Sequence, residues 1–423
     1  MKRILITTPL LLILGCGGSQ HSVDLTPPGA PSERPSASKP SVKAPVIKGQ
    51  ARNAFALGVK AFNAQGPKHD YEAAIRYFKE AASEEPTFGA AYFNVGLSYH
   101  RLGKISDAEV WYRKASESGR AFGDGLASIG FVRLTEGKAQ EADSLFREAL
   151  VLDRLNGGAN LNLAHEARAR GDYKSAVKHV RNALQGDSQN ALAYPVLGRI
   201  YYDLGRYELA KLVCLTGLKI DPQMATLHNV LGLVHLKLDD VRSALGAFEA
   251  AVAAEPNFVP AHINIGAITF NYRDYEASLR HFEAVLKVEP KNVNAMVSRA
   301  AALRGLERLG EAEAGYKAAL DVNSKYVPAH FNLGILYQEY LNKLDEAVRS
   351  YGLVLQHERQ DGALRTDVTN RIKAVRIQIQ NMKEVAEMMR QQKEQEAKQE
   401  ATQGAGSDNQ GTQQSEQPNE GEE

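Results

Sequence analysis

Histidine and cysteine are the residue types in this sequence that could ligate a metal ion or act as nucleophiles. The chain holds eleven histidines and two cysteines, Cys16 and Cys214. No histidine pair has the helical spacing, with a nearby glutamate, of a metalloprotease site. His228, His262 and His330 stand at steps of 34 and 68 residues, and this regularity indicates a structural position. We therefore predict no catalytic residue, no metal site, no cofactor and no enzymatic activity.

The amino terminus carries a short apolar run that ends at a cysteine. The run covers about 11 residues, from Ile4 to Leu14, after two basic residues. It is too short to span a bilayer, which takes about 20 residues, but it suits a signal peptide. Its end, with Gly15 and Cys16, resembles the lipobox of bacterial lipoproteins. The resemblance implies that residues 1–15 are removed and that Cys16 is lipidated, with palmitate among its acyl chains. The alternative is an ordinary secretory peptide that contains a cysteine.

The residues after Cys16 indicate in which membrane the protein is anchored and how the anchor is connected to the rest of the chain. Gly17 follows the cysteine, which by the sorting pattern of enterobacterial lipoproteins favours an outer-membrane lipoprotein facing the periplasm over an inner-membrane one. Six of the sixteen prolines lie between residues 17 and 50, among serine, alanine and lysine. Such a stretch cannot bury a core. We interpret residues 16–50 as the lipidated cysteine and a disordered, Pro/Ser-rich tether.

A repeat of 34 residues organises the centre of the chain. The phrases "VPAHINIGAI" and "VPAHFNLGIL" begin at Val259 and Val327, and a weaker copy begins halfway, at Val293. Twelve residues after each recurring small residue comes a second small one, and four beyond it a bulky, mostly aromatic one. The recurring small residues are Gly96, Gly130, Ala164, Gly198, Gly232, Gly266, Ala300 and Gly334. Small residues facing each other let two antiparallel helices approach closely, with the bulky residue filling the gap beside them.

The ends of the helices are also marked. Glycine recurs where the first helix of a repeat must end in a left-handed turn, and aspartate recurs at the N-cap of the second helix. Proline stops several second helices. The turn glycines are Gly103, Gly137, Gly171 and Gly205, replaced later by Asp239, Arg273 and Glu307, and the capping aspartates are Asp172, Asp240 and Asp274. In the last repeat the pattern shifts by one residue, to Ala347.

This pattern resembles the tetratricopeptide repeat. The resemblance implies an all-α, helix–turn–helix solenoid of about nine repeats over residues 51–360. It also implies a concave face, lined by the first helices, that takes peptides or partner segments. On that face it places a polar, mostly basic set, which is Arg101, His165, Arg168, Arg199, Lys237 and Arg304, and an aromatic set that includes Phe93, Phe131 and Phe331. Basic side chains there suit carboxylates of a partner, whereas the aromatic set has a second interpretation, packing against the neighbouring helix.

The chain beyond the repeats has two parts. Apolar residues from Val368 to Met389 follow one another at alternating steps of four and three residues, which is typical of a helical seam. We predict a helix over residues 361–400 that caps the solenoid, or alternatively a coiled coil that forms a homodimer. Residues 401–423 are rich in Gln, Gly and Glu, and their composition predicts a disordered acidic tail.

Composition narrows the functional class. The net charge is +1, which argues against a dedicated nucleic-acid binder, since such domains carry a marked basic patch. The plan of lipobox, tether, array and polar helix resembles the tetratricopeptide lipoproteins of the myxobacterial gliding-motility machinery. This implies a lipid-anchored protein–protein interaction scaffold of the bacterial cell envelope, whose partners are envelope proteins. The alternatives are an assembly factor for type IV pili, secretins or outer-membrane proteins, and a regulatory subunit of a cell-wall or polysaccharide enzyme.

Overall fold

The computed structural model describes residues 47–63, 70–118, 123–358 and 362–407, with side chains as far as residue 398. Helices account for all the regular structure in these residues, so the predicted all-α class is confirmed. The chain divides into two compact units between Ala261 and His262, and each unit is considered by itself. The predicted signal peptide, Cys16 and nearly all of the tether lie outside the described residues.

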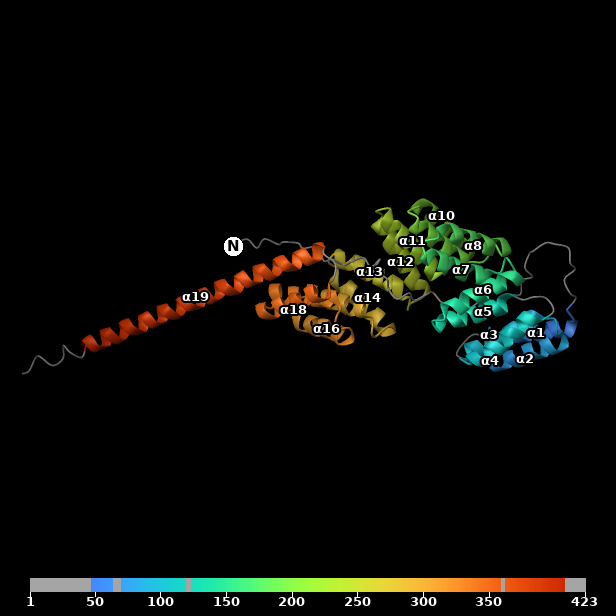
Figure 1. The fold of residues 1–423 in the computed structure, drawn as a ribbon, viewed down its shortest axis with the longest axis horizontal. Coiled ribbons are helices and arrows are strands. Elements are labelled where there is room, and N and C mark those ends of the chain that lie inside the picture. Colours follow the sequence, from blue (N-terminus) through green and yellow to red (C-terminus); the bar gives the residue numbers. More distant parts are fainter. Residues whose placement is uncertain (1–46, 64–69, 119–122, 359–361, 408–423) are drawn as a thin grey trace, which may run out of the picture. The chain divides into compact units, whose positions relative to one another are not determined.

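The first unit contains six helix pairs among its described residues, and the members of a pair pack against each other (Figure 1). In chain order these are α1 (Gly49–Phe62) with α2 (Tyr71–Glu84), α3 (Gly89–Arg101) with α4 (Ile105–Glu117), α5 (Gly123–Thr135) with α6 (Ala139–Leu152), α7 (Gly157–Ala169) with α8 (Tyr173–Gly186), α9 (Ala193–Asp203) with α10 (Tyr207–Ile220), and α11 (Ala225–Lys237) with α12 (Val241–Ala254).

The second unit continues the same plan and then ends in a single long helix. Its elements are α13 (Val259–Asn271, beginning just before the boundary), α14 (Tyr275–Val288), α15 (Val293–Gly305), α16 (Leu309–Val322), α17 (Val327–Ile335), the π-helical turn η1 (Leu336–Tyr340), α18 (Leu344–His357) and α19 (Ala363–Ser407). With three pairs here and six in the first unit, the predicted count of about nine repeats is confirmed.

Glycine allows the two helices of a repeat to pack closely, as the sequence predicts. A Cβ atom on Gly232 would lie 2.5 Å from the ring of Phe248, and one on Gly334 would lie 2.5 Å from the ring of Tyr351. Cys214 holds the place of the aromatic residue in its own repeat and is fully buried. Burial raises the pKa of its thiol to about 12, so this cysteine behaves as a small apolar core residue.

The turns inside the repeats are left-handed with or without glycine. The predicted turn glycines have φ angles of 70° to 78°, whereas Asp239, Arg273 and Glu307 have φ angles of 59°, 64° and 59°. This conformation costs a residue with a side chain about 1–2 kcal/mol. Packing of the flanking helices therefore overrides the local preference at these three positions.

The predicted caps and stops of the second helices are confirmed. The carboxylates of Asp172, Asp240 and Asp274 each accept a hydrogen bond of 3.0 Å from the backbone N–H three residues later. Helices α2, α10, α12 and α14 each end two residues before a proline. Local chemistry thus fixes where most of the second helices begin and several of them end.

The last repeat differs from the others by one inserted residue. The π-helical turn η1 follows α17 directly and widens the helix there. Such a turn absorbs one extra residue within a helix, which explains why the small-residue pattern shifts to Ala347. Asn342 then takes the left-handed turn position, with a φ angle of 51°.

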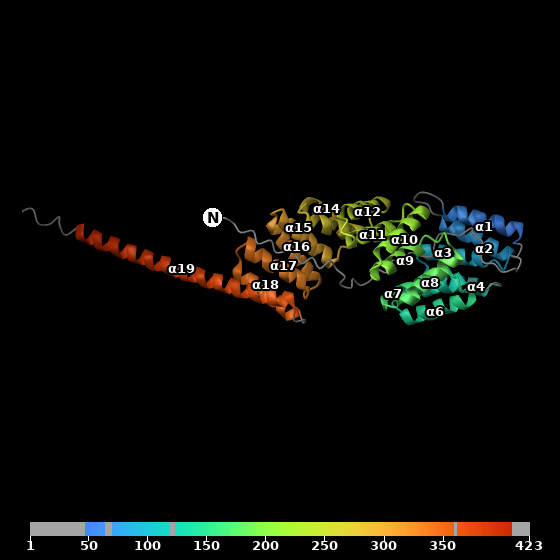
Figure 2. The same cartoon turned by 90° about the horizontal axis from the view of Figure 1, so that it is seen from above.

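Helix α19 caps the array with its first part only. Val368, Ile372 and Val375 are buried in one hydrophobic cluster with residues of α18, so the predicted cap is confirmed there. From Asn381 to Lys398 every side chain is exposed, and Figure 2 shows α19 continuing past α18. The helix extends to Ser407, so the prediction of disorder is wrong for residues 401–407. Their own helix propensity is low, but extending an existing helix avoids the cost of starting a new one. Residues 408–423 lie outside the described residues.

None of the described helices combines the length and the apolar composition that crossing a membrane requires.

Candidate functional site

The first helices of consecutive repeats lie beside one another. In the first unit α7 packs against both α5 and α9, and α9 packs against α11; in the second unit α15 packs against α17. The second helices α2, α4, α6, α8, α10 and α16 instead pack against the first helices of their own and the next repeat. Helices α5, α7, α9 and α11 form a continuous row in the first unit, and α15 lies beside α17 in the second. We call the surface formed by the first helices of the repeats in each unit the first-helix face. The predicted site residues all lie on these helices.

Two of the predicted arginines share one carboxylate. Arg168 Nη1 lies 2.7 Å from Asp203 Oδ2, and Arg199 Nε lies 3.1 Å from Asp203 Oδ1. The Arg199 guanidinium also lies 5.2 Å from the ring centre of Tyr202. The single carboxylate of Asp203 neutralises only one of the two positive charges. It holds Arg168 of α7 and Arg199 of α9 in place at the same time. We find here a cluster with one net positive charge, on side chains that are fixed in place.

The predicted histidine of this set is a neutral group. His165 is half-buried on α7. Burial, together with the nearby charge of Arg168, lowers the pKa of His165 to about 4. At neutral pH the imidazole can donate or accept a hydrogen bond but carries no charge.

Arg101 and Lys237 are the accessible cations of the predicted set. Both lie at the carboxyl end of a first helix and are exposed. Neither forms an ion pair with a residue in the described ranges. Both side chains can therefore reach a ligand without breaking an existing ion pair.

Arg304 was predicted as a groove residue but is buried, with 8% of its surface exposed. Its Nη1 donates to Asn332 Oδ1 at 3.4 Å, and its guanidinium lies 5.7 Å from the ring centre of Tyr340. Unlike Arg101 and Lys237, the Arg304 side chain is therefore largely covered from solvent. The amide of Asn332 on α17 and the ring of Tyr340 in η1 cover the guanidinium.

The aromatic set packs into the core. Phe93 and Phe131 are 9% and 7% exposed, and the Phe93 ring lies 5.5 Å from that of Tyr112. Phe331 is half-buried and lies under the guanidinium of Arg371 of α19, 5.8 Å away. The packing interpretation therefore describes these side chains, and the capping helix covers the first-helix face at Phe331.

The histidines at equivalent places bind their own backbone. Nε2 of His228 and Nε2 of His330 each lie 2.9 Å from the carbonyl oxygen of the residue six positions earlier. His262 lies beside His281, with the two Nδ1 atoms 2.8 Å apart. No group of three or more metal-ligating side chains occurs in the part of the chain that the structure describes.

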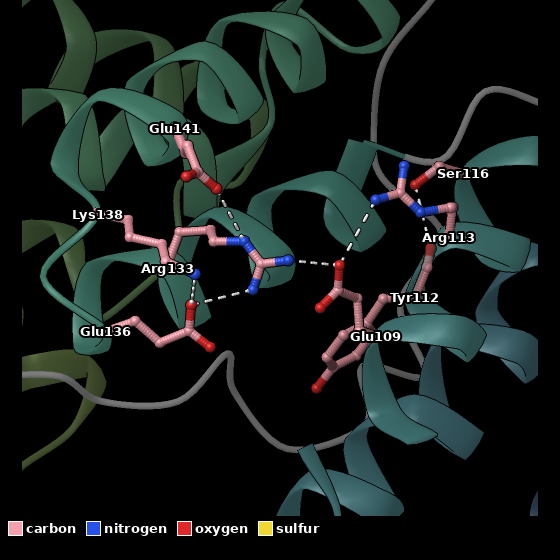
Figure 3. A network of polar contacts seen from close by, with 8 residues as sticks. All are labelled: Glu109, Tyr112, Arg113, Ser116, Arg133, Glu136, Lys138 and Glu141. Atoms are coloured by element: carbon pink, nitrogen blue, oxygen red, sulfur yellow. Dashed lines mark hydrogen bonds and ion pairs between the residues drawn. The ribbon is translucent and has the colours of Figure 1, made fainter. Parts of the chain in front are cut away.

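A network of charges joins two repeats on the first unit (Figure 3). Arg133 of α5 contacts Glu109 of α4 at 2.6 Å, and Glu136 and Glu141 at 3.2 Å each. Arg113 and Lys138 complete the network. Its three basic and three acidic groups leave no net charge, so we interpret it as a contact between repeats and not as a binding site.

Sequence reasoning missed the partners of the arginines. Asp203 stands 35 residues after Arg168, and Glu339 stands 35 residues after Arg304. The sequence could have predicted the contact of Arg168 with Asp203, because Asp203 stands one repeat and one residue later, at the end of the next first helix. The sequence could not have predicted that Glu339 pairs with Arg371, because this contact depends on η1 and on the position of α19.

Comparison with known proteins is consistent with this fold. Family models described as tetratricopeptide repeat match residues 60–121, 167–234 and 272–328. Among solved structures, the human IFIT1 dimer with m7Gppp-AAAA is 17% identical, with a TM-score of 0.51 over 78% of this chain and 83% of that chain. MamA from Desulfovibrio magneticus RS-1 is 22% identical, with a TM-score of 0.37 over 41% of this chain and 97% of that chain. YrrB, described as a TPR protein with an unusual peptide-binding site, is 23% identical, with a TM-score of 0.34 over 44% and 95%.

No curated protein matches the chain in the sequence comparison. The helix pairs, their register and the three matched segments show that the chain belongs to the tetratricopeptide repeat family. Arrays of this family bind partner proteins, which places the chain among protein–protein interaction scaffolds.

Proposed function

We propose that this protein is a lipid-anchored scaffold of the bacterial cell envelope, which binds envelope proteins through its first-helix face. The observation that carries the proposal is the row of first helices, with exposed Arg101 and Lys237 and the net positive cluster around Asp203. Such groups suit acidic partner segments. The lipobox-like residues before Cys16 support the anchor, and Gly17 supports an outer-membrane position facing the periplasm.

The process served by the scaffold is part of the proposal. The plan of lipobox, tether, array and polar helix supports a place in a gliding-motility machinery. The runner-up is an assembly factor for type IV pili, secretins or outer-membrane proteins, or a regulatory subunit of a cell-wall or polysaccharide enzyme. Identification of the proteins that co-purify with the anchored chain distinguishes these, because each role requires a different class of partner.

The exposed part of α19 supplies a second proposed surface. Met382, Val385 and Met389 are 50%, 44% and 62% exposed, and they continue the apolar seam that caps the last repeat. Met-rich helical surfaces adapt to partner helices. In this proposal the segment pairs with a second copy of the chain, and sedimentation of the purified protein across a concentration series measures that association.

The proposed lipid anchor at Cys16 can be tested by removing its thiol. Replacing Cys16 by Ala should abolish incorporation of a clickable palmitate analogue and release the protein from the membrane fraction, because the thiol is the proposed acceptor and several acyl chains are needed for stable anchoring. The measurement is in-gel labelling with fractionation of intact cells.

Cys214→Ala is the matched control, since that thiol is buried and should leave labelling unchanged. Equal labelling of the Cys16→Ala chain and its parent would contradict the proposed anchor.

A further inference from the structure

Arg304 is a buried cation without a carboxylate partner among the described residues. Its contacts are the amide oxygen of Asn332 at 3.4 Å and the ring of Tyr340. A guanidinium removed from water costs free energy unless a counter-charge or several hydrogen bonds compensate it. One long hydrogen bond to an amide and one ring contact supply little of that compensation.

The equivalent arginine in an earlier repeat has the missing partner. Arg168 precedes Arg304 by 136 residues, which is four repeats of 34, and it pairs with Asp203 at 2.7 Å. The residue equivalent to Asp203 in the last repeat is Glu339. Glu339 lies in η1, however, and its carboxylate accepts a hydrogen bond of 3.0 Å from Arg371 of α19. Glu339 of the π-helical turn thus pairs with the capping helix, and Arg304 lacks the carboxylate that Arg168 has in Asp203.

A hydroxyl group beside Arg304 is also unpaired. Tyr316 Oη is buried and has no hydrogen-bond partner. In two other repeats the tyrosine at this place has a hydrogen-bond partner: Tyr112 Oη lies 3.3 Å from His100 Nδ1 of α3, and Tyr351 Oη donates to Gln338 of η1 at 2.8 Å. His100 precedes Tyr112 by twelve residues, and Arg304 precedes Tyr316 by the same twelve. Arginine cannot accept a hydrogen bond, so Arg304 cannot take the role of His100, and the Tyr316 hydroxyl is left as a donor without an acceptor.

We infer that Arg304 and Tyr316 form a binding site for one carboxylate of a partner segment. A carboxylate supplies the single negative charge that Arg304 lacks and can accept hydrogen bonds from both donors. Asn332 positions the guanidinium, since its own amide N–H donates to Pro328 O at 2.9 Å. Tyr340 is 46% exposed, and the ligand reaches the guanidinium by displacing this ring.

The inference rests on the proposed function, since the carboxylate belongs to a bound partner. Its test uses the full chain in detergent and three fluorescein-labelled peptides: hexaglutamate with an amidated carboxyl terminus, hexaglutamine with a free carboxyl terminus, and amidated hexaglutamine. The first two separate side-chain carboxylates from a terminal one. We expect one of them to bind at least tenfold more tightly than the third, by fluorescence anisotropy, and Arg304→Met to weaken that binding at least tenfold.

Arg299→Met is the matched control on the same helix, because Arg299 already pairs with Glu283 at 3.2 Å; its binding should stay within about twofold of the parent. Without peptide, Arg304→Met should melt at the same temperature as the parent or higher, since a buried unpaired charge is removed. Unchanged binding by Arg304→Met, an equal loss in Arg299→Met, or a lower melting temperature of Arg304→Met would each overturn the inference.

Partner recovery separates this inference from the proposed function. If only the inference is wrong, envelope partners are still recovered while peptide binding is insensitive to Arg304→Met. If only the proposed function is wrong, the parent binds the acidic peptide through Arg304 but recovers no envelope protein.

Discussion

Replacing Gly232 by Leu is expected to lower the free energy of unfolding by about 3 kcal/mol, at the upper end of what overpacking a core usually costs. Even a Cβ atom at Gly232 would lie 2.5 Å from one ring carbon of Phe248 and 2.7 Å from the next. Phe248 is fully buried, so its ring can move only by displacing α11 from α12. The measurement is denaturant unfolding of the full chain in detergent, followed by far-ultraviolet circular dichroism.

Gly246→Leu is the matched control, because Gly246 lies on α12 of the same repeat and a Cβ atom there would meet nothing within 4 Å. Leucine at an exposed helical position should raise stability by up to about 1 kcal/mol. The single tryptophan, Trp111 of α4, reports on a distant repeat. Since solenoid stability is nearly a sum of local terms, its fluorescence transition should shift less than the circular dichroism signal. Equal midpoints for the two leucine variants would contradict the packing account.

Replacing Arg371 by Met is expected to detach the first part of α19 and to cost about 2 kcal/mol, from the loss of charge-assisted hydrogen bonds that are partly shielded from water. The side chain of Arg371 is 12% exposed and holds Glu339 of η1 and Asp367 of its own helix at 3.0 Å each. It also covers Phe331. Hydrogen exchange of the backbone amides between residues 363 and 380 should accelerate in the variant.

Arg390→Met provides the comparison on the same helix. Arg390 is 74% exposed in its side chain and pairs with Glu394, four residues on, so its loss should cost no more than about 0.5 kcal/mol. Similar exchange rates in the two variants would show that Arg371 does not hold the cap.

The repeat, its register and its turns were predictable because they depend on residues that recur every 34 positions. Gly232 against Phe248, the left-handed Gly171 and the cap of Asp274 each follow from chemistry within one repeat. Asp239, by contrast, adopts the turn conformation without glycine, and only the register of its neighbours predicts this.

The candidate site was less predictable, because it depends on which charges meet between repeats. The pattern places Arg168 and Arg304 at the same position but does not distinguish an arginine paired with Asp203 from one left without an acid. The difference arises from one inserted residue in η1 and from the contact of Arg371 with Glu339. The inserted residue and the contact with α19 each occur once in the chain, so a pattern of recurring residues cannot predict them.

Site-specific photo-crosslinking in intact cells tests the central claim, that partners bind the first-helix face. A photoreactive phenylalanine replaces Arg101, Lys237 or Val151, one at a time. Arg101 and Lys237 are exposed on first helices, whereas Val151 is 84% exposed on α6, a second helix. We predict that the first two positions capture the same envelope protein and that Val151 does not. Capture of that protein at Val151 alone, or equally at all three positions, would contradict the claim.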